Sequence, residues 1–209
     1  MAGDGAPPAP PVEPLVGVLA LQGGFEAHER MLRGLGARTR EVRVPADLDG
    51  LDGLVIPGGE STTMTLGIER EGLAEPLREL NAAGTPIMGS CAGLIMLDCE
   101  HLGLMDMRAQ RNAFGRQSRS FETDLDVKGL PGGRLRGIFI RAPWIAEYDA
   151  KKVEILAEVD GHPVAARQGR MLAVAFHGEL GEDDRLHGLF LREVQQAKMA
   201  RAAAAPRAR

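Results

Sequence analysis

Short apolar segments alternate with segments of helical periodicity along this chain of 209 residues, and this alternation restricts the fold more than any other feature. In the first half, helical patterns lie at residues 24–35, 62–70 and 74–83, and strand patterns lie at 15–21, 38–44, 53–56 and 86–89. The second half is richer in strands, at 122–127, 134–141, 153–159, 164–168 and 171–176, before a closing helix at about 183–196. Strands separated by helices form mostly parallel sheets with helices on both faces. We therefore predict a single α/β domain.

The two ends of the chain differ in composition from the rest. Residues 1–14 contain five prolines and almost nothing that a core could bury, which predicts a disordered lead. Residues 197–209 are rich in alanine and basic, and we interpret them as a tail after the last helix. No repeat or linker interrupts residues 15–196, so we predict that they form the domain.

The composition argues against a membrane or a nucleic acid as a partner. Apolar residues make up 44% of the chain, charged residues make up 26%, and the net charge is −4. No apolar run reaches the roughly 18 residues that cross a bilayer, and residues 1–14 lack the order of a secretory signal. The chain has only eight aromatic side chains for stacking on bases, and it has no strongly basic block.

The two cysteines, Cys91 and Cys99, lie eight residues apart. We expect both on one helix, where the rise per residue separates them by about 12 Å. A disulfide requires Cα atoms within about 7 Å, so we predict two free thiols. Free thiols persist in reducing compartments, which favours the cytoplasm.

The segment Gly89-Ser90-Cys91-Ala92-Gly93 has the pattern of a nucleophile elbow. Glycines two positions before and after the central residue let a strand turn sharply into a helix, which lifts the side chain out of the sheet. Backbone N–H groups at the start of the helix stabilise a thiolate and bind an oxyanion. The alternative, a small buried cysteine in a glycine-rich turn, fits an isolated motif equally well.

A histidine and an acid near the end of the chain decide between these alternatives. His177 and Glu179 follow the strand predicted at 171–176, and in an extended chain they project to the same side. The acid then orients the imidazole, which gives the nucleophile, base and orienting acid of a catalytic triad. We expect the remaining histidines to be structural or surface residues: His28, His101, His162 and His187.

The loop Pro57-Gly58-Gly59-Glu60-Ser61-Thr62 follows another predicted parallel strand. Ligands bind at the carboxyl ends of such strands, so we expect this loop and Cys91 to face one pocket. The N–H groups of Gly59 and Ala92 are candidates for an oxyanion hole. A simpler role, with Ser61 or Thr62 as a helix N-cap, is compatible with binding.

Six segments together resemble the glutaminase subunits of pyridoxal 5′-phosphate synthase, which are class I (triad) glutamine amidotransferases. The resemblance covers residues 15–194, and its segments are VGVLALQG (16–23), PGGESTTM (57–64), CAGLI (91–95), RNAFGRQ (111–117), FIRAP (139–143) and FHGEL (176–180). It implies a flavodoxin-like, three-layer fold. It also implies Cys91 as nucleophile, His177 as acid and base, and Glu179 as its orienting partner.

The resemblance extends to substrate and partner. It implies that L-glutamine binds to Gly59, Glu60, Ser61, Arg111, Ile140 and Arg141. It implies no cofactor or metal for the glutaminase, whose ammonia goes to a (β/α)₈ synthase subunit that makes pyridoxal 5′-phosphate. Such glutaminases are weakly active until they dock on that subunit. The alternative for Arg111, and for Arg116, is a surface salt bridge.

One position departs from the family pattern, because Gly178 stands where these glutaminases have proline. Glycine restores backbone freedom, so the triad is expected to be less preorganised. Two alternatives stay open at this stage. One is another Cys/His/Glu hydrolase, such as a γ-glutamyl peptidase or the glutaminase subunit of imidazole glycerol phosphate synthase. The other is a non-catalytic partner module.

Overall fold

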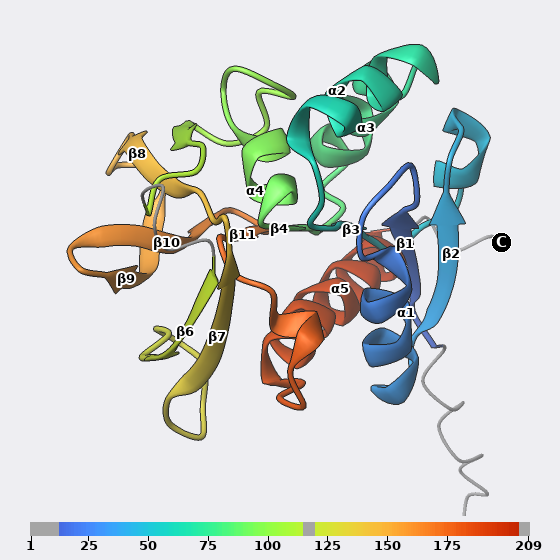
Figure 1. Cartoon of the computed structure of the whole chain (residues 1–209). Coiled ribbons are helices and arrows are strands. Elements are labelled where there is room, and N and C mark those ends of the chain that lie inside the picture. Colours follow the sequence, from blue (N-terminus) through green and yellow to red (C-terminus); the bar gives the residue numbers. More distant parts are fainter. Residues whose placement is uncertain (1–12, 115–119, 205–209) are drawn as a thin grey trace, which may run out of the picture.

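A computed structural model describes residues 13–114 and 120–204, and its centre is a seven-stranded sheet (Figure 1). The strand order is β2-β1-β3-β4-β11-β10-β9. The strands span Leu15–Leu19 (β1), Arg38–Val42 (β2), Gly53–Ile56 (β3), Ile87–Ser90 (β4), Glu154–Val159 (β9), His162–Gln168 (β10) and Met171–Val174 (β11). Strands β1 to β4 and β11 pair in parallel, whereas β10 pairs antiparallel with both of its neighbours. The predicted mostly parallel sheet is confirmed.

Helices cover both faces of this sheet, so the molecule has the three layers that were predicted (Figure 1). Helices α1 (Phe25–Gly34) and α5 (Arg185–Ala204) lie on one face, and α2 (Ser61–Arg70), α3 (Ala74–Ala82) and α4 (Ala92–Leu97) lie on the other. Two 3₁₀ helices, η1 (Pro45–Leu48) and η2 (Gly178–Leu180), complete the set. Every residue of β3, β4 and β11 is buried, as expected for parallel strands between two helical layers.

Two small antiparallel sheets lie beside the β9 and β10 end of the central sheet (Figure 1). One pairs β6 (Ser120–Leu125) with β7 (Leu135–Ile140), close to the strands predicted there. The other pairs β5 (Met107–Gln110) with β8 (Trp144–Tyr148), and neither was predicted. Most of β8 is exposed, and an exposed edge strand lacks the apolar alternation that marks a half-buried one.

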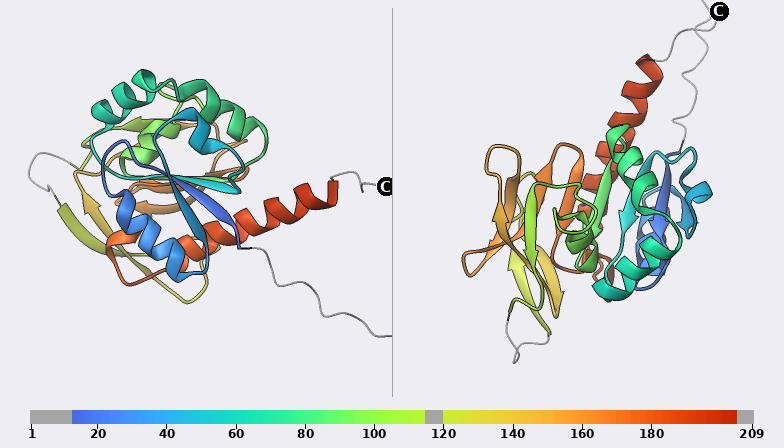
Figure 2. Two further views of the ribbon diagram at one scale, coloured as in Figure 1. Left: turned by 90° about the vertical axis from the view of Figure 1, so that its right-hand side faces the viewer. Right: turned by 90° about the horizontal axis from the view of Figure 1, so that it is seen from above.

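The last helix is longer than predicted. It was expected to end at about residue 196, but α5 continues to Ala204 because alanine has the highest helix propensity. Lys198 and Arg201 also form ion pairs with the Asp52 carboxylate, at 2.7 and 3.3 Å. These contacts hold the end of α5 against the residue that precedes β3. Figure 2 shows the end of α5 projecting beyond the body of the molecule. Residues 1–12 and 205–209 lie outside the described part, so the disordered lead and the domain limits stay predictions.

The two cysteines are free thiols, as predicted, but they do not share a helix. Helix α4 ends at Leu97, because Asp98 adopts an extended conformation with ψ of 171°. Cys99 therefore lies in the following turn and is exposed, not packed along α4. The expectation that both cysteines lie on one helix was wrong.

Within residues 13–114 and 120–204, none of the helices is both long enough and apolar enough to pass through a membrane.

Candidate active site

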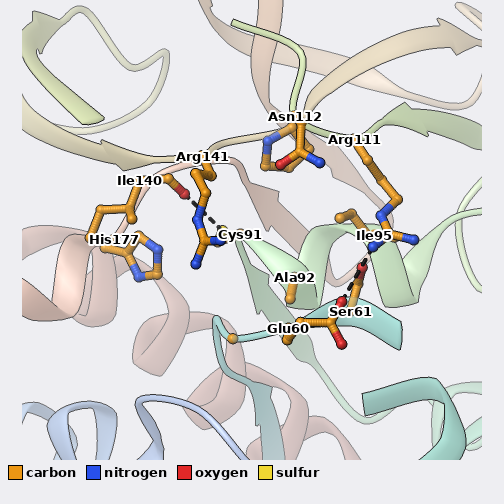
Figure 3. Close-up of a pocket in the computed structure, with 12 residues that line it drawn as sticks. Glu60, Ser61, Cys91, Ala92, Ile95, Arg111, Asn112, Ile140, Arg141 and His177 are labelled. Atoms are coloured by element: carbon orange, nitrogen blue, oxygen red, sulfur yellow. Dashed lines mark hydrogen bonds and ion pairs between the residues drawn. The ribbon is translucent and has the colours of Figure 1, made fainter. Parts of the chain in front are cut away.

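Three loops meet at the carboxyl ends of β3, β4 and β11, which are neighbours in the sheet. The loop after β3 carries Gly59, Cys91 follows β4, and His177 follows β11. They line a cavity of about 370 Å³ (Figure 3), within the range of roughly 300–1,000 Å³ for small-molecule sites. The other lining residues are Glu60, Ser61, Ala92, Ile95, Arg111, Asn112, Ile140, Arg141 and Pro143. The structure thus brings every predicted site residue to one cavity, except Glu179, which is buried behind His177.

Cys91 occupies the predicted sharp turn from strand to helix. Its φ of +50° and ψ of −104° are unusual for a residue with a side chain, and its N–H donates to Val174 O at 2.8 Å. The flanking glycines are sterically required. A Cβ on Gly89 would lie 2.5 Å from Gly93 O, and one on Gly93 would lie 2.0 Å from Ile56 O. Close packing of backbone on backbone therefore holds the Cys91 thiol at the cavity.

Glu179 reaches His177 by a different route from the one predicted. Strand β11 ends at Val174, and His177 immediately precedes the 3₁₀ helix η2, so the chain is not extended there. The tight turn nevertheless brings Glu179 Oε1 to 2.6 Å from His177 Nδ1. The His177 N–H donates to Ile138 O at 2.8 Å, which fixes the backbone of this segment on β7.

Hydrogen bonds and charges around His177 favour its protonated form. Burial acts to lower the pKa of His177, but hydrogen bonds with Cys91 and Glu179, together with their charges, raise it to about 10. Burial acts to raise the pKa of Glu179, but the hydrogen bond with His177 and the charge of His177 outweigh it, so the net pKa is lowered. The pair is therefore an imidazolium and a carboxylate at neutral pH.

The absence of a side chain at Gly58 lets His177 approach Cys91. A Cβ on Gly58 would lie 2.4 Å from His177 Cε1 and 3.3 Å from the Cys91 Cβ. Cys91 and His177 therefore lie on either side of the space that a side chain at position 58 would occupy. The thiol also faces Ile140 O, at 3.9 Å from Sγ. A thiol beside a basic imidazole that is fixed by a carboxylate has the components of a nucleophile and its proton acceptor.

The opposite side of the cavity carries charged groups (Figure 3). Glu60 is the N-cap of α2, because its carboxylate accepts from Thr62 N at 3.0 Å and Thr63 N at 2.7 Å. Hydrogen bonds from Thr63 and Thr62 lower its pKa to about 2. The alternative of Ser61 or Thr62 as N-cap was wrong. Arg111 donates to Glu60 Oε1 at 3.3 Å and to Thr62 at 3.2 Å, so its salt bridge and its place at the cavity coexist. Arg116 lies outside the described residues.

Sequence reasoning missed Gln22 as a site residue. The Gln22 side chain accepts from Glu60 N at 3.0 Å and donates to Glu60 O at 3.1 Å, so it pairs with the backbone of that residue as a neighbouring strand would. The pairing fixes the loop that follows β3. Its position in the sequence could have identified it. Gln22 follows the carboxyl end of β1, and β1 lies beside β3 in the sheet.

The expectation that the other histidines are structural or surface residues was incomplete. His101 pairs with Asp98 at 2.7 Å, and His162 stacks on Trp144. His28 and His187, however, are completely buried, and His28 lies 3.5 Å from the Glu179 carboxylate. The distance of His28 from Glu179 in the sequence left no local signal of this contact.

Taken together, the parallel sheet, the cysteine elbow and the histidine–carboxylate pair define a class of α/β thiol enzymes with a triad. Residues 18–196 match the model of the SNO glutamine amidotransferase family, and the chain belongs to this family.

Named relatives agree with this assignment. The chain is 50% identical over 192 residues to "Pyridoxal 5′-phosphate synthase subunit PdxT" of Geobacillus kaustophilus, covering 88% of this chain and 97% of the relative. It is also 50% identical over 187 residues to the protein of that name in Streptomyces avermitilis, covering 85% and 92%. A crystal structure of a glutamine amidotransferase superposes with a TM-score of 0.80 at 44% identity, covering 86% of this chain and 98% of the other.

Proposed function

We propose that this chain is the glutaminase subunit of pyridoxal 5′-phosphate synthase. It hydrolyses L-glutamine to L-glutamate and ammonia, and the ammonia passes to a (β/α)₈ synthase subunit. The observation that carries the proposal is the hydrogen-bonded His177–Glu179 pair beside the Cys91 elbow, in a cavity with charges for an amino acid. Nearly full-length relatives with the synthase name support the choice of partner. The two free thiols favour the cytoplasm as the location.

The charged groups of the cavity match the ends of glutamine. Arg111 and Arg141 are the lining residues that can pair with the α-carboxylate. Glu60 is the acid among the lining residues, and its low pKa keeps it ionised to receive the α-ammonium. The side-chain amide then extends past Gly59, Ser61 and Ile140 toward Cys91.

The first half of the reaction forms a thioester. The Cys91 proton rests on His177, which its raised pKa keeps protonated, and the Cys91 thiolate attacks the side-chain amide carbon of glutamine. The N–H of Ala92, the first residue of α4, has no acceptor within that helix, so it is free to stabilise the oxyanion together with Gly59 N–H. When the C–N bond breaks, His177 donates its proton to the departing nitrogen, which leaves as ammonia.

The second half releases glutamate. A water molecule gives a proton to His177 and attacks the γ-glutamyl thioester carbon. The C–S bond then breaks, glutamate leaves, and the Cys91 thiolate again faces protonated His177. Glu179 holds the imidazole in place and stabilises its positive charge in both halves. Every proton transfer uses His177, so this scheme requires no cofactor or metal.

The proposal predicts that Cys91→Ala abolishes glutaminase activity without loss of the fold. Mass spectrometry of the wild-type chain treated with a glutamine-based alkylating analogue is expected to show one label, on Cys91. Cys99→Ala is the matched control, because Cys99 is exposed and outside the cavity, and it is expected to retain activity and label. Full turnover by the Cys91 variant would refute the proposed nucleophile.

The choice of synthase has its own test. Co-purification with a (β/α)₈ pyridoxal 5′-phosphate synthase subunit, with glutamine-dependent product formation by the complex, is the expected result. Productive association with an imidazole glycerol phosphate synthase instead would keep the chemistry and replace the partner. Absence of any glutaminase activity in the complex would favour a non-catalytic module.

A further inference from the structure

A row of buried polar side chains that the mechanism above does not use lies behind Glu179. His28, from α1, has its Nε2 3.5 Å from Glu179 Oε2 and 3.0 Å from Ser90 Oγ. Its Nδ1 lies 2.9 Å from Nε2 of His187, which belongs to α5. Both histidines have no exposed surface, and Ser90 has almost none. Side chains from α1, β4 and α5 therefore meet at His28, which contacts the Glu179 carboxylate.

The second oxygen of Glu179 requires a hydrogen-bond donor. Oε1 accepts from His177, but no group in the described residues makes a conventional hydrogen bond to the buried Oε2. A buried carboxylate oxygen without a partner is costly. His28 Nε2 is the nitrogen that faces it, at 3.5 Å. Such contacts in ligand-free enzymes commonly shorten when substrate binds.

The positions of the protons on His28 and His187 follow from the surroundings of two atoms, His28 Nε2 and His187 Nδ1. Burial lowers the pKa of both histidines, so each is neutral and carries one N–H. Suppose that His28 carried its proton on Nδ1 and donated it to His187 Nε2. His187 would then hold a buried N–H on its own Nδ1, which has no partner in the described residues. A lone pair of His28 Nε2 would also face the Glu179 carboxylate. With the protons on the Nε2 atoms, His187 donates to His28, and His28 Nε2–H points at Ser90 and Glu179. This arrangement leaves a lone pair, not a donor, at His187 Nδ1, which costs less.

We propose that His28 is a positioning residue of the triad, whose Nε2–H holds Oε2 of Glu179 while His187 fixes the required tautomer. The contact keeps Glu179 Oε1 aimed at His177 Nδ1, so the imidazole stays oriented toward Cys91. The groups that face His28 are Glu179 and His177 near the cavity, Ser90 on β4 and His187 on α5. The inference rests on the proposed glutaminase activity for its kinetic test but not for its spectroscopic one.

Two conservative variants of His28 separate its two nitrogens. His28→Gln places an amide nitrogen near the position of Nε2, and His28→Asn places one near Nδ1, so only Gln retains a donor toward Glu179. In the full chain with its synthase partner, we expect His28→Asn to lower kcat by about 10-fold with little change in KM, by analogy with the loss of about 10–100-fold when a residue that orients a metal ligand is replaced. We expect His28→Gln to stay within about threefold of wild type, since its donor remains.

A control on the same helix distinguishes positioning from general destabilisation. Leu32 is completely buried and lies one turn after His28, so Leu32→Ala lowers the thermal midpoint without touching Glu179. We expect it to retain wild-type kcat at a temperature where it is folded. Equal losses of kcat in Leu32→Ala and His28→Asn would overturn the proposal, as would wild-type kcat in His28→Asn.

A measurement on the unaltered chain tests the proposal even if His28→Asn fails to fold. Nitrogen NMR of the histidine rings reports which nitrogen carries the proton. We expect neutral Nε2–H tautomers for His28 and His187, and in His28→Asn a shifted His177 Nδ1–H resonance. An Nδ1–H tautomer of His28 would overturn the proposal. This spectrum needs no turnover, so an inactive wild-type enzyme would refute the proposed function alone.

Discussion

Replacement of His187 by glutamine is expected to make the fold less sensitive to acid. Burial is the main reason that the pKa of His187 falls from 6.5 to about 3. In the unfolded chain this imidazole binds a proton below pH 6.5, so acid stabilises the unfolded state alone. Each pH unit costs about 1.4 kcal/mol, so the loss between pH 6.5 and about pH 5 is roughly 2 kcal/mol. Glutamine does not titrate, and its amide nitrogen retains a donor toward His28.

Urea denaturation followed by circular dichroism measures this difference. Between about pH 7 and about pH 5, His187→Gln is expected to lose about 2 kcal/mol less free energy of unfolding than wild type. The control is Phe190→Leu, because Phe190 is buried on the same helix and does not titrate. It should lower the free energy of unfolding by the same amount at both pH values. An identical pH dependence in wild type and His187→Gln would refute the reasoning.

Three further predictions concern the turns and the cavity. Gly178→Pro, at the first position of η2, is expected to raise the free energy of unfolding by about 0.4–1 kcal/mol with equal or higher activity, and a large loss of kcat/KM would show that the turn cannot accept proline. Gly93→Ala is expected to cost about 3 kcal/mol or more in urea denaturation, because its Cβ would lie 2.0 Å from Ile56 O. Gly34→Ala, with open space around its Cβ, is the control, and equal effects would contradict the steric argument. Arg111→Gln is expected to raise KM for glutamine about 10-fold or more and to change stability by less than about 1 kcal/mol, because its ion pair is exposed; an unchanged KM would remove Arg111 from the site.

The parts of the site that the sequence predicts are those built by backbone packing. The elbow at Cys91 requires glycine at 89 and 93, and these glycines are visible as a motif. The loop after β3 is visible for the same reason, because Gly58 leaves room for His177. The parallel strands were equally predictable, since strands buried on both faces are continuous apolar runs.

The parts that sequence reasoning missed depend on contacts between distant segments. Gln22 pairs with a peptide 38 residues away, and His28 pairs with a residue 159 positions away, so neither leaves a local pattern. The strand β8 was not predicted for a different reason. Its exposed edge positions tolerate any polar residue, so its sequence carries no strand pattern. The contact between His177 and Glu179 was expected from strand alternation and is made by a 3₁₀ turn instead. Spacing in the sequence therefore identified the partner but not the backbone geometry.

The same buried groups that support catalysis also confine the stability of the fold to a range of pH. The pKa of His177 is raised to about 10, so its contribution is complete below 6.5 and is lost as the pH rises through about 10. His28 and His187 act in the opposite sense, because their lowered pKa values make folding less favourable below 6.5. Glu179 adds to the acid side, since its contribution is lost as the pH falls through its lowered pKa. These groups together favour the folded state most near neutral pH. In that range His177 is charged and His28 is neutral, the protonation states that the triad and its buried support require.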